Sequence, residues 1–336
     1  MSKKSAVWFA VVIFILCNFI LTCSPERDNP YDINSPNKKQ SQIIGRVMTK
    51  VGNPIKSAQV SLIFQNIGKT IIVSSDSNGN YDLRYYYDIE QGDSAQISVT
   101  KSNYADYLQI IKIGINQFDT FNFLLNALPQ FSAESITSQY EQLRPFPGDI
   151  FSVTFSVHVI DADGPGDIDS IVVSVPSLYY SIALNYDYNN NYKRTIQAEY
   201  LPGANLENLI GKDCYFIVYS KPDQQTISAP YQLTRIIYNV PEQVYPVEDT
   251  VSNNFNCVWS YFNAYFPFTY EVEVFYLSEI NPVPISVFDT TGIVSSDTSI
   301  FVHKYLANGR YLWQVSLKDN FGNIGKSNRI LFYIRP

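Results

Sequence analysis

The sequence predicts an all-β protein made of three tandem β-sandwich domains, which follow a signal peptide and a flexible tether. From Ser41 onward, short β-branched and aromatic runs alternate with Gly, Pro and Asn turn signals about every 8 to 12 residues. No stretch keeps an apolar period of about 3.6 residues over three turns, so helices are not expected. The chain has 336 residues, which suits two or three domains of roughly 100–200 residues each.

The composition excludes several functional classes. Hydrophobic residues make up 46% of the chain, but only 2 His and 4 Cys are present. This scarcity removes most zinc sites, haem sites and His-based proton relays. The formal charge is −7, and without Lys3 and Lys4 it would be 22 basic against 31 acidic residues, or −9. We therefore expect no nucleic-acid partner.

Residues 1–22 have the layout of an export signal. Lys3 and Lys4 form a short positive region, and residues 6–21 are apolar apart from one Asn. The alternative is an uncleaved transmembrane anchor, because about 17 apolar residues lie at the lower limit for a spanning helix. Either arrangement holds the protein at a membrane.

The end of this segment, Ile-Leu-Thr-Cys at residues 20–23, resembles the lipobox of bacterial lipoproteins. In that family the Cys thiol receives a diacylglyceryl group and the chain is cleaved before it. The resemblance implies lipid attachment at Cys23, although Thr22 stands where Gly, Ala or Ser is usual. Two or more acyl chains give stable anchoring. Ser24 favours transfer to the outer membrane of a bacterial cell envelope.

Residues 23–40 are predicted to form a flexible tether, because they carry three prolines and almost no apolar side chains. The first domain follows at residues 41–126. Tyr81, Leu83, Tyr85 and Tyr87 alternate along one strand face. A tight turn is expected before them, with a positive φ at its glycine.

Three motifs in this first domain carry a resemblance: Gly45-x-Val47, Gly52-x-Pro54-Ile55-x-x-Ala58-x-Val60 and Ser75-Asp76-x-x-Gly79-x-Tyr81-x-Leu83. They resemble the carboxypeptidase regulatory-like domain, a transthyretin-like sandwich. Ser75 replaces the usual Thr, and Asn103 stands where Gly is common. The resemblance implies an accessory module without peptidase activity, because in those enzymes the zinc site belongs to a different domain.

A second, Ig-like sandwich is predicted at residues 127–239, from alternating strands at 151–160 and 171–175. The turn between these strands holds four carboxylates, namely Asp161, Asp163, Asp167 and Asp169. Hard oxygen ligands of this kind suit Ca²⁺. The spacing is not that of an EF-hand loop. A solvated Asp/Gly turn without metal is the favoured interpretation, so at most weak, millimolar calcium binding is expected and no other cofactor.

Candidate ligand contacts in this domain are three tyrosines around an Asn-rich hairpin tip: Tyr186, Tyr188 and Tyr192. On the approaching strand Ile182, Leu184, Tyr186 and Tyr188 are expected to share one face. Tyrosine combines an apolar ring with a hydroxyl, which suits protein or sugar surfaces. The alternative is that these rings only close the end of the sandwich, which the abundance of tyrosine favours.

A third sandwich is predicted at residues 240–336. Cys257-Val-Trp259, Tyr270-Glu-Val-Glu-Val274 and Leu306-x-x-Gly309-Arg-Tyr311-x-Trp313-x-Val315 resemble a fibronectin type III domain. The resemblance implies a tyrosine corner at Tyr311. Trp259 and Trp313 are expected in the core.

Catalysis finds little support in the sequence. His158 and His303 lie inside alternating strand patterns, where surface or edge positions are expected, and neither is near a nucleophile motif. Cys214 and Cys257 fall in different predicted modules, so two separately buried thiols are expected rather than a disulfide.

The expected function is that of a non-enzymatic, membrane-anchored envelope lipoprotein that displays its sandwiches to a protein or glycan partner. Two alternatives remain open: an envelope hydrolase or its accessory subunit, and a structural spacer without a ligand.

Overall fold

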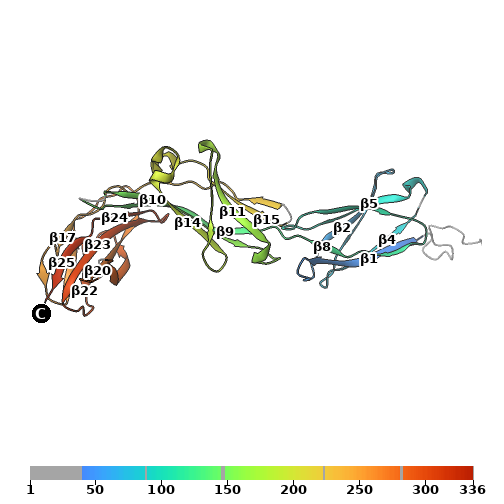
Figure 1. Ribbon diagram of the computed structural model, residues 1–336. Coiled ribbons are helices and arrows are strands. Elements are labelled where there is room, and N and C mark those ends of the chain that lie inside the picture. Colours follow the sequence, from blue (N-terminus) through green and yellow to red (C-terminus); the bar gives the residue numbers. More distant parts are fainter. Residues whose placement is uncertain (1–39, 88, 145–147, 222–223, 281–282, 336) are drawn as a thin grey trace, which may run out of the picture. The chain divides into compact units, whose positions relative to one another are not determined.

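A computed structural model describes residues 40–87, 89–144, 148–221, 224–280 and 283–335 (Figure 1). The predicted signal peptide, the lipid-attachment residue Cys23 and the tether up to residue 39 lie outside the described residues. The fold is all-β, as predicted, and consists of β-sandwiches with three hydrophobic cores. The chain divides into two compact units, the first ending at Ala127 and the second beginning at Leu128.

In the residues that the structure describes, helical structure is confined to short 3₁₀ turns: η1 (Ile89–Gln91), η2 (Pro165–Asp167), η3 (Pro176–Leu178), η4 (Ala198–Tyr200), η5 (Pro202–Ala204) and η6 (Leu206–Leu209). Within the described ranges, none of these helices has the length and apolar character needed to span a bilayer.

The first sandwich packs two four-stranded sheets around one core. In one sheet β1 (Gln40–Thr49) pairs antiparallel with β4 (Asn80–Tyr86) and parallel with both β7 (Phe118–Thr120) and β8 (Phe123–Leu125). The other sheet has the order β3 (Lys69–Ser74), β2 (Gln59–Phe64), β5 (Ser94–Thr100) and β6 (Tyr107–Lys112).

Local sequence explains this sandwich well. Tyr81, Leu83 and Tyr85 are buried at 4% exposure or less, which confirms the predicted strand face. The turn before them closes because the Asp76 carboxylate accepts the backbone N–H groups of Asn78 and Asn80, both at 2.8 Å. Gly45 is required for another reason: a Cβ there would lie 1.6 Å from the Phe121 carbonyl oxygen, where the chain passes from β7 to β8.

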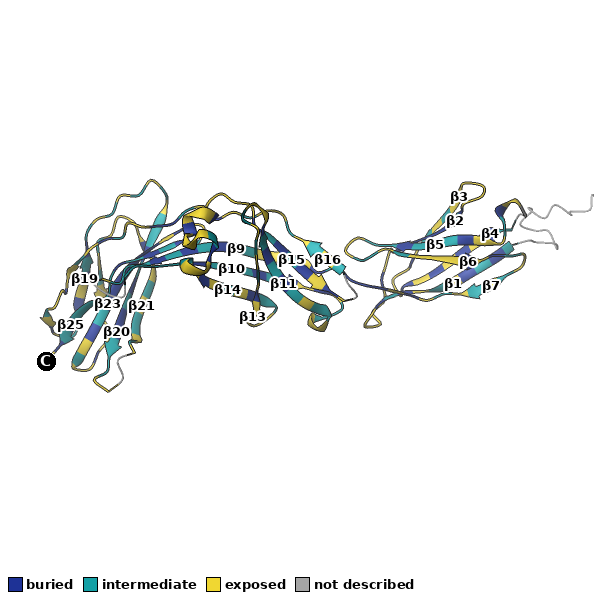
Figure 2. Ribbon diagram, turned by 45° about the horizontal axis from the view of Figure 1, so that its top comes forward, coloured by how far each residue is buried: buried dark blue, intermediate teal, exposed yellow. Residues whose placement is uncertain are grey.

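The second sandwich also has two sheets. One continues through β13 (Asn185–Tyr186), β14 (Asn191–Gln197), β10 (Ile150–Ile160) and β9 (Gln130–Glu141). The other has the order β12 (Tyr180–Ala183), β11 (Ile168–Val175), β15 (Tyr215–Ser220) and β16 (Gln224–Ile227). Buried residues alternate along β10 and β11, as their sequence pattern predicts (Figure 2).

The third sandwich contains a small sheet of β17 (Gln243–Tyr245), β19 (Phe255–Trp259) and β22 (Ser299–Val302). Facing it are β20 (Phe268–Leu277), β21 (Ile285–Val294), β23 (Gly309–Asp319), β24 (Ile324–Lys326), β25 (Ile330–Ile334) and β18 (Thr250–Val251). Trp259 and Trp313 are 1% and 0% exposed, which confirms their predicted place in the core. The Tyr311 hydroxyl donates to the Ala307 carbonyl at 2.6 Å, so a tyrosine corner is present.

The second and third sandwiches share one ten-stranded sheet, which the sequence did not predict. The shared sheet arises because β24 pairs in parallel with β9 and antiparallel with β23. Gly325 of β24 also packs closely against the segment that links the two sandwiches, since a Cβ there would lie 2.6 Å from the Ile237 carbonyl oxygen. The two sandwiches therefore belong to one compact unit.

A buried polar network fixes this junction. Asn323 is 0% exposed, and its Oδ1 accepts the Ser138 N–H at 2.9 Å. Its Nδ2 donates to Thr234 Oγ1 and to Asp319 Oδ2, each at 2.9 Å. The same Asp319 oxygen lies 3.2 Å from Arg235 Nε. Because Asn323, Ser138 and Asp319 are buried, breaking a hydrogen bond among these three leaves a desolvated polar partner.

Candidate functional site

The predicted hairpin at the Asn-rich segment is present as the β13–β14 hairpin. Asn189 and Asn190 have φ values of 48° and 59°, as a type I′ turn requires. The turn is closed by hydrogen bonds from the Asp187 N–H to the Asn191 carbonyl and from the Asn191 N–H to the Tyr188 carbonyl, each 2.9 Å. Asparagine tolerates this left-handed conformation better than most residues, so the local sequence specifies the turn.

The three predicted tyrosines separate into two roles. Tyr186 and Tyr188 are 59% and 62% exposed, whereas Tyr192 is 8% exposed and belongs to the hydrophobic core. The Tyr192 ring lies 5.5 Å from the Tyr186 ring in an edge-on arrangement. Burial, together with Tyr186, raises the pKa of the Tyr192 hydroxyl above its ordinary value. Tyr192 therefore supports Tyr186 from beneath, and only the other two rings are open to a ligand.

The expected single strand face from Ile182 to Tyr188 is wrong. Ile182 lies on β12, which pairs with β11, while Tyr186 lies on β13, which pairs with β14 in the opposite sheet. The chain changes sheets at Leu184, which is buried and whose N–H still bonds the Ile171 carbonyl at 2.8 Å. Alternation in sequence continues through this crossover, so it could not reveal the change of sheet.

A shallow hollow of about 330 Å³ lies against the hairpin strands. Its lining is polar apart from one ring and consists of Asn185, Tyr186, Asp187, Lys193, Arg194 and Thr195. Arg194 is held in place by a hydrogen bond from Nη1 to the Ala183 carbonyl at 3.0 Å. The hairpin thus combines two exposed rings with both signs of charge.

Three of the four predicted calcium ligands lie together. One carboxylate oxygen from each of Asp161, Asp163 and Asp167 can be placed within 4.8 Å of the others. Asp169 is exposed on β11 and is not part of this group. Lys221 Nζ lies 3.3 Å from the Gly166 carbonyl, so an ammonium group stands beside the turn. Three carboxylates fall short of the six or more oxygens that Ca²⁺ prefers, and weak calcium binding stays a prediction.

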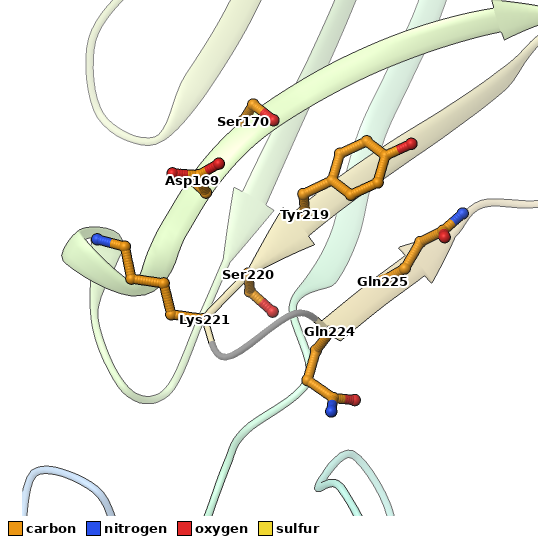
Figure 3. Close-up of a pocket in the computed structure, with 7 residues that line it drawn as sticks. All are labelled: Asp169, Ser170, Tyr219, Ser220, Lys221, Gln224 and Gln225. Atoms are coloured by element: carbon orange, nitrogen blue, oxygen red, sulfur yellow. The ribbon is translucent and has the colours of Figure 1, made fainter.

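A larger trough lies at the end of the β15–β16 hairpin and was missed by sequence reasoning (Figure 3). Its volume is about 640 Å³, and it is lined by Asp169, Ser170, Tyr219, Ser220, Lys221, Gln224 and Gln225. A sequence signal that could have revealed this trough is the polar run from Ser220 to Thr226. Paired strands of a sandwich usually carry more apolar residues than this.

The histidines and cysteines are where the sequence placed them. Cys214 and Cys257 are free and buried, and burial raises the pKa of each thiol to about 12. His303 is exposed, and the His158 ring is half-buried with Nδ1 2.9 Å from Ser132 Oγ. Among the contacts of the described residues, none joins the His158 ring to a carboxylate. This Ser–His contact therefore lacks the orienting acid of a triad.

Comparison with known proteins gives no relative by sequence: no family model and no curated protein matches this chain. Three solved structures illustrate the likeness in structure. The 3-chlorocatechol 1,2-dioxygenase of Rhodococcus opacus matches with 11% identity over 27% of this chain and 61% of its own, at a TM-score of 0.22. The chain thus spans less than two thirds of that enzyme's length.

The other two matches are longer. BcpA, the major pilin subunit of Bacillus cereus, matches with 10% identity over 85% of this chain and 91% of its own, at a TM-score of 0.31. The FN1–FN3 domains of chicken CNTN1 match with 11% identity over 84% and 96%, also at 0.31. TM-scores of this size carry no information on function, so the chain's own geometry must supply it.

Proposed function

We propose that this chain is a non-enzymatic, lipid-anchored display protein of a bacterial cell envelope, and that it binds a partner protein through the β13–β14 hairpin. The observation that carries the proposal is the exposure of Tyr186 and Tyr188 on a hairpin whose turn and supporting ring are fixed. Because the hairpin is already ordered in the free protein, less conformational entropy is lost when a partner binds.

The chemistry of the hairpin favours a protein over a glycan as its partner. Tyr186 lines the hollow together with Asp187, Lys193 and Arg194, so both signs of charge stand next to an exposed ring. Protein surfaces mix these groups in the same way, and Tyr and Arg are enriched at their contact centres.

Anchoring is the second part of the proposal. Cleavage before Cys23 and acylation of its thiol would hold the tether in a membrane, with the outer membrane favoured by Ser24. Intact-mass analysis of the membrane fraction tests this step, and an acylated N-terminal Cys23 is the expected species. A chain that keeps Met1 and carries no lipid contradicts it, as does membrane retention of a processed Cys23→Ala variant.

Site-specific crosslinking in intact cells tests the binding surface. A photoreactive phenylalanine at position 188 is expected to give a discrete protein adduct, and the same group at Tyr265 serves as the matched control because that ring is 104% exposed on the third sandwich. The adduct should weaken when Tyr186→Ser is added. Equal labelling at both positions, or an adduct that is glycan only, contradicts the proposal. Hydrolytic activity of the purified chain would support the enzyme alternative instead.

A further inference from the structure

The outer edge of β6 in the first sandwich is an unpaired strand edge with apolar side chains. β6 stands at the end of its sheet beside β5, and no other strand of the described residues pairs with it. Leu108 and Ile110 on this strand are 63% and 69% exposed, and most of β6 is exposed in Figure 2. Proteins usually protect such edges with lysine, proline or a bulge, because a free edge can pair with another chain. Two exposed aliphatic side chains at the centre of this edge point to a partner strand.

The backbone of β6 turns alternate residues toward this open edge. The Ile113 N–H, directly after the strand, bonds the Asp93 carbonyl on the β5 side at 2.9 Å. N–H and C=O groups alternate in direction along an antiparallel ladder, so the even-numbered residues of β6 turn theirs away from β5. Among the hydrogen bonds of the described residues, these even-numbered backbone groups receive one, a 3.4 Å contact from Gln117 Nε2 to the Lys112 carbonyl. The centre of the edge is therefore free to pair.

The side chains of the same residues lie on the outer face of the sheet. Ile111 is 4% exposed and belongs to the first core. Because neighbouring strand residues point to opposite faces, Leu108, Ile110 and Lys112 share the outer face. Asp106 is exposed and directly precedes the strand in the same alternation. The outer face of the edge thus carries, in order, an acid, two aliphatic side chains and a base.

This order of side chains is complementary to itself. If two copies of β6 pair antiparallel about a two-fold axis at Gln109, Asp106 of each copy lies opposite Lys112 of the other. In the same register Leu108 of each copy lies opposite Ile110 of the other. Neither Asp106 nor Lys112 forms an ion pair with another described residue, so both charges are available.

Only this register matches both kinds of group. The nearest registers that still pair the open backbone groups have their axis at Leu108 or at Ile110, and each places an aliphatic side chain opposite a charge. A shift by one residue would bring open backbone groups opposite groups that already bond β5. The match of charges and aliphatic groups in a single register identifies a second copy of this chain as the occupant.

We propose that the protein self-associates through β6, which pairs antiparallel with β6 of a second copy in this register. The two four-stranded sheets then join edge to edge into one sheet. This surface is separate from the β13–β14 hairpin and does not rest on the function proposed for it. An edge-to-edge contact is small, so the association should be weak in solution and stronger where two copies share one membrane.

Cysteine crosslinking of the full chain in intact cells tests the register. Gln109 is exposed, and the proposed axis places it opposite itself in a non-hydrogen-bonded pair with Cα atoms about 4.5 Å apart, which suits a disulfide. Gln109→Cys should therefore form a crosslinked dimer under mild oxidation. Leu108→Cys would place its two thiols on a diagonal of roughly 7–8 Å and should crosslink about tenfold less. Ile72→Cys, 53% exposed on the opposite edge strand β3, is the matched control and should stay at the wild-type level.

Charge reversal tests the complementarity. In the Gln109→Cys background, Asp106→Lys would place like charges opposite each other at both ends and should lower the dimer yield about tenfold, as should Lys112→Asp. Combining the two reversals exchanges the charges and should restore crosslinking to the level of Gln109→Cys alone. Damage to the fold would add up in the double variant instead of cancelling. Both side chains are exposed, so the unfolding midpoints should not move.

Three results would overturn the proposal. The first is crosslinking of Gln109→Cys that does not exceed that of Ile72→Cys. The second is a double charge reversal that crosslinks as poorly as the single reversals, because the two side chains would then not lie opposite each other. The third is an adduct of Gln109→Cys with a different protein in place of the dimer, which would assign the edge to another partner.

Discussion

The first sandwich and the pair formed by the second and third sandwiches use the same strand patterns but bury them differently. The first closes two separate four-stranded sheets on a core of its own. In the pair, one ten-stranded sheet contributes to two cores, and a buried network around Asn323 lies where they meet. Modules of one class can therefore be separate or fused, and the difference lies in a few polar residues and one glycine.

This difference bears on function because the β13–β14 hairpin lies on the pair and β6 lies on the first sandwich. In chain order the first sandwich stands between the proposed tether and the pair. The surface proposed above for a partner protein therefore lies on the fused pair and not on the first sandwich. The following changes should affect one unit and spare the other.

The largest effect is expected for Gly45→Ala in the first sandwich. Its Cβ would overlap the Phe121 carbonyl oxygen, so a backbone segment must shift, and about 3 kcal/mol of stability should be lost. Urea unfolding followed by circular dichroism should show an earlier transition for the first unit. The fluorescence transition of Trp259 and Trp313 should not move in a Trp8→Phe background, because both rings lie in the third core. A shift of that transition would contradict the separation of the units.

Asn323→Ala should destabilise the fused pair and leave the stability of the first sandwich unchanged. It removes the hydrogen bonds to Ser138, Thr234 and Asp319 inside the junction, and the pair should lose roughly 2–3 kcal/mol. The fluorescence midpoint should fall while the first unit keeps its transition. Asn78→Ala, which removes an exposed amide from the first sandwich, is the matched control and should be neutral. A neutral Asn323→Ala would mean that the junction contributes no stability.

The smallest expected effect is on the stability of the first sandwich at acid pH. Hydrogen bonds to the Asp76 carboxylate, led by the one from the Asn80 N–H, lower the pKa of this group. A lowered folded pKa means that the carboxylate stabilises the first sandwich above its unfolded pKa of about 3.9, and that this contribution disappears as the pH falls through the folded value. Asp76→Asn should therefore make the first transition slightly less sensitive to pH below about 4. If the stability of the Asp76→Asn variant depends on pH in the same way as that of the wild type, the Asp76 carboxylate does not contribute to the acid sensitivity of the first sandwich.

The sequence predicted what depends on local pattern. Alternation placed Tyr81, Leu83, Trp259 and Trp313 in cores, and the Asn pair placed the I′ hairpin, because side-chain period and turn chemistry are properties of short segments. The sequence also predicted that Cys214 and Cys257 are separately buried thiols and do not form a disulfide, and both are free and buried.

Features that depend on residues far apart in the chain could not be predicted from the sequence. The sheet change at Leu184, the pairing of β24 with β9 and the burial of Tyr192 each require knowing which strands become neighbours. The trough was missed for the same reason. Its groups come from β11 and from the β15–β16 hairpin, which are about fifty residues apart in sequence and meet only through pairing.

The central claim is that the second and third sandwiches form one folding unit that carries the hairpin proposed to bind a partner protein. Cys214 lies in the second core and Cys257 in the third, and each thiol is unreactive while its core is closed because burial raises its pKa to about 12. Pulsed thiol labelling across a urea series, read for each cysteine by peptide mass spectrometry, measures when each core opens. Coincident midpoints for Cys214 and Cys257 are predicted; labelling of one at a urea concentration that leaves the other protected would contradict the claim.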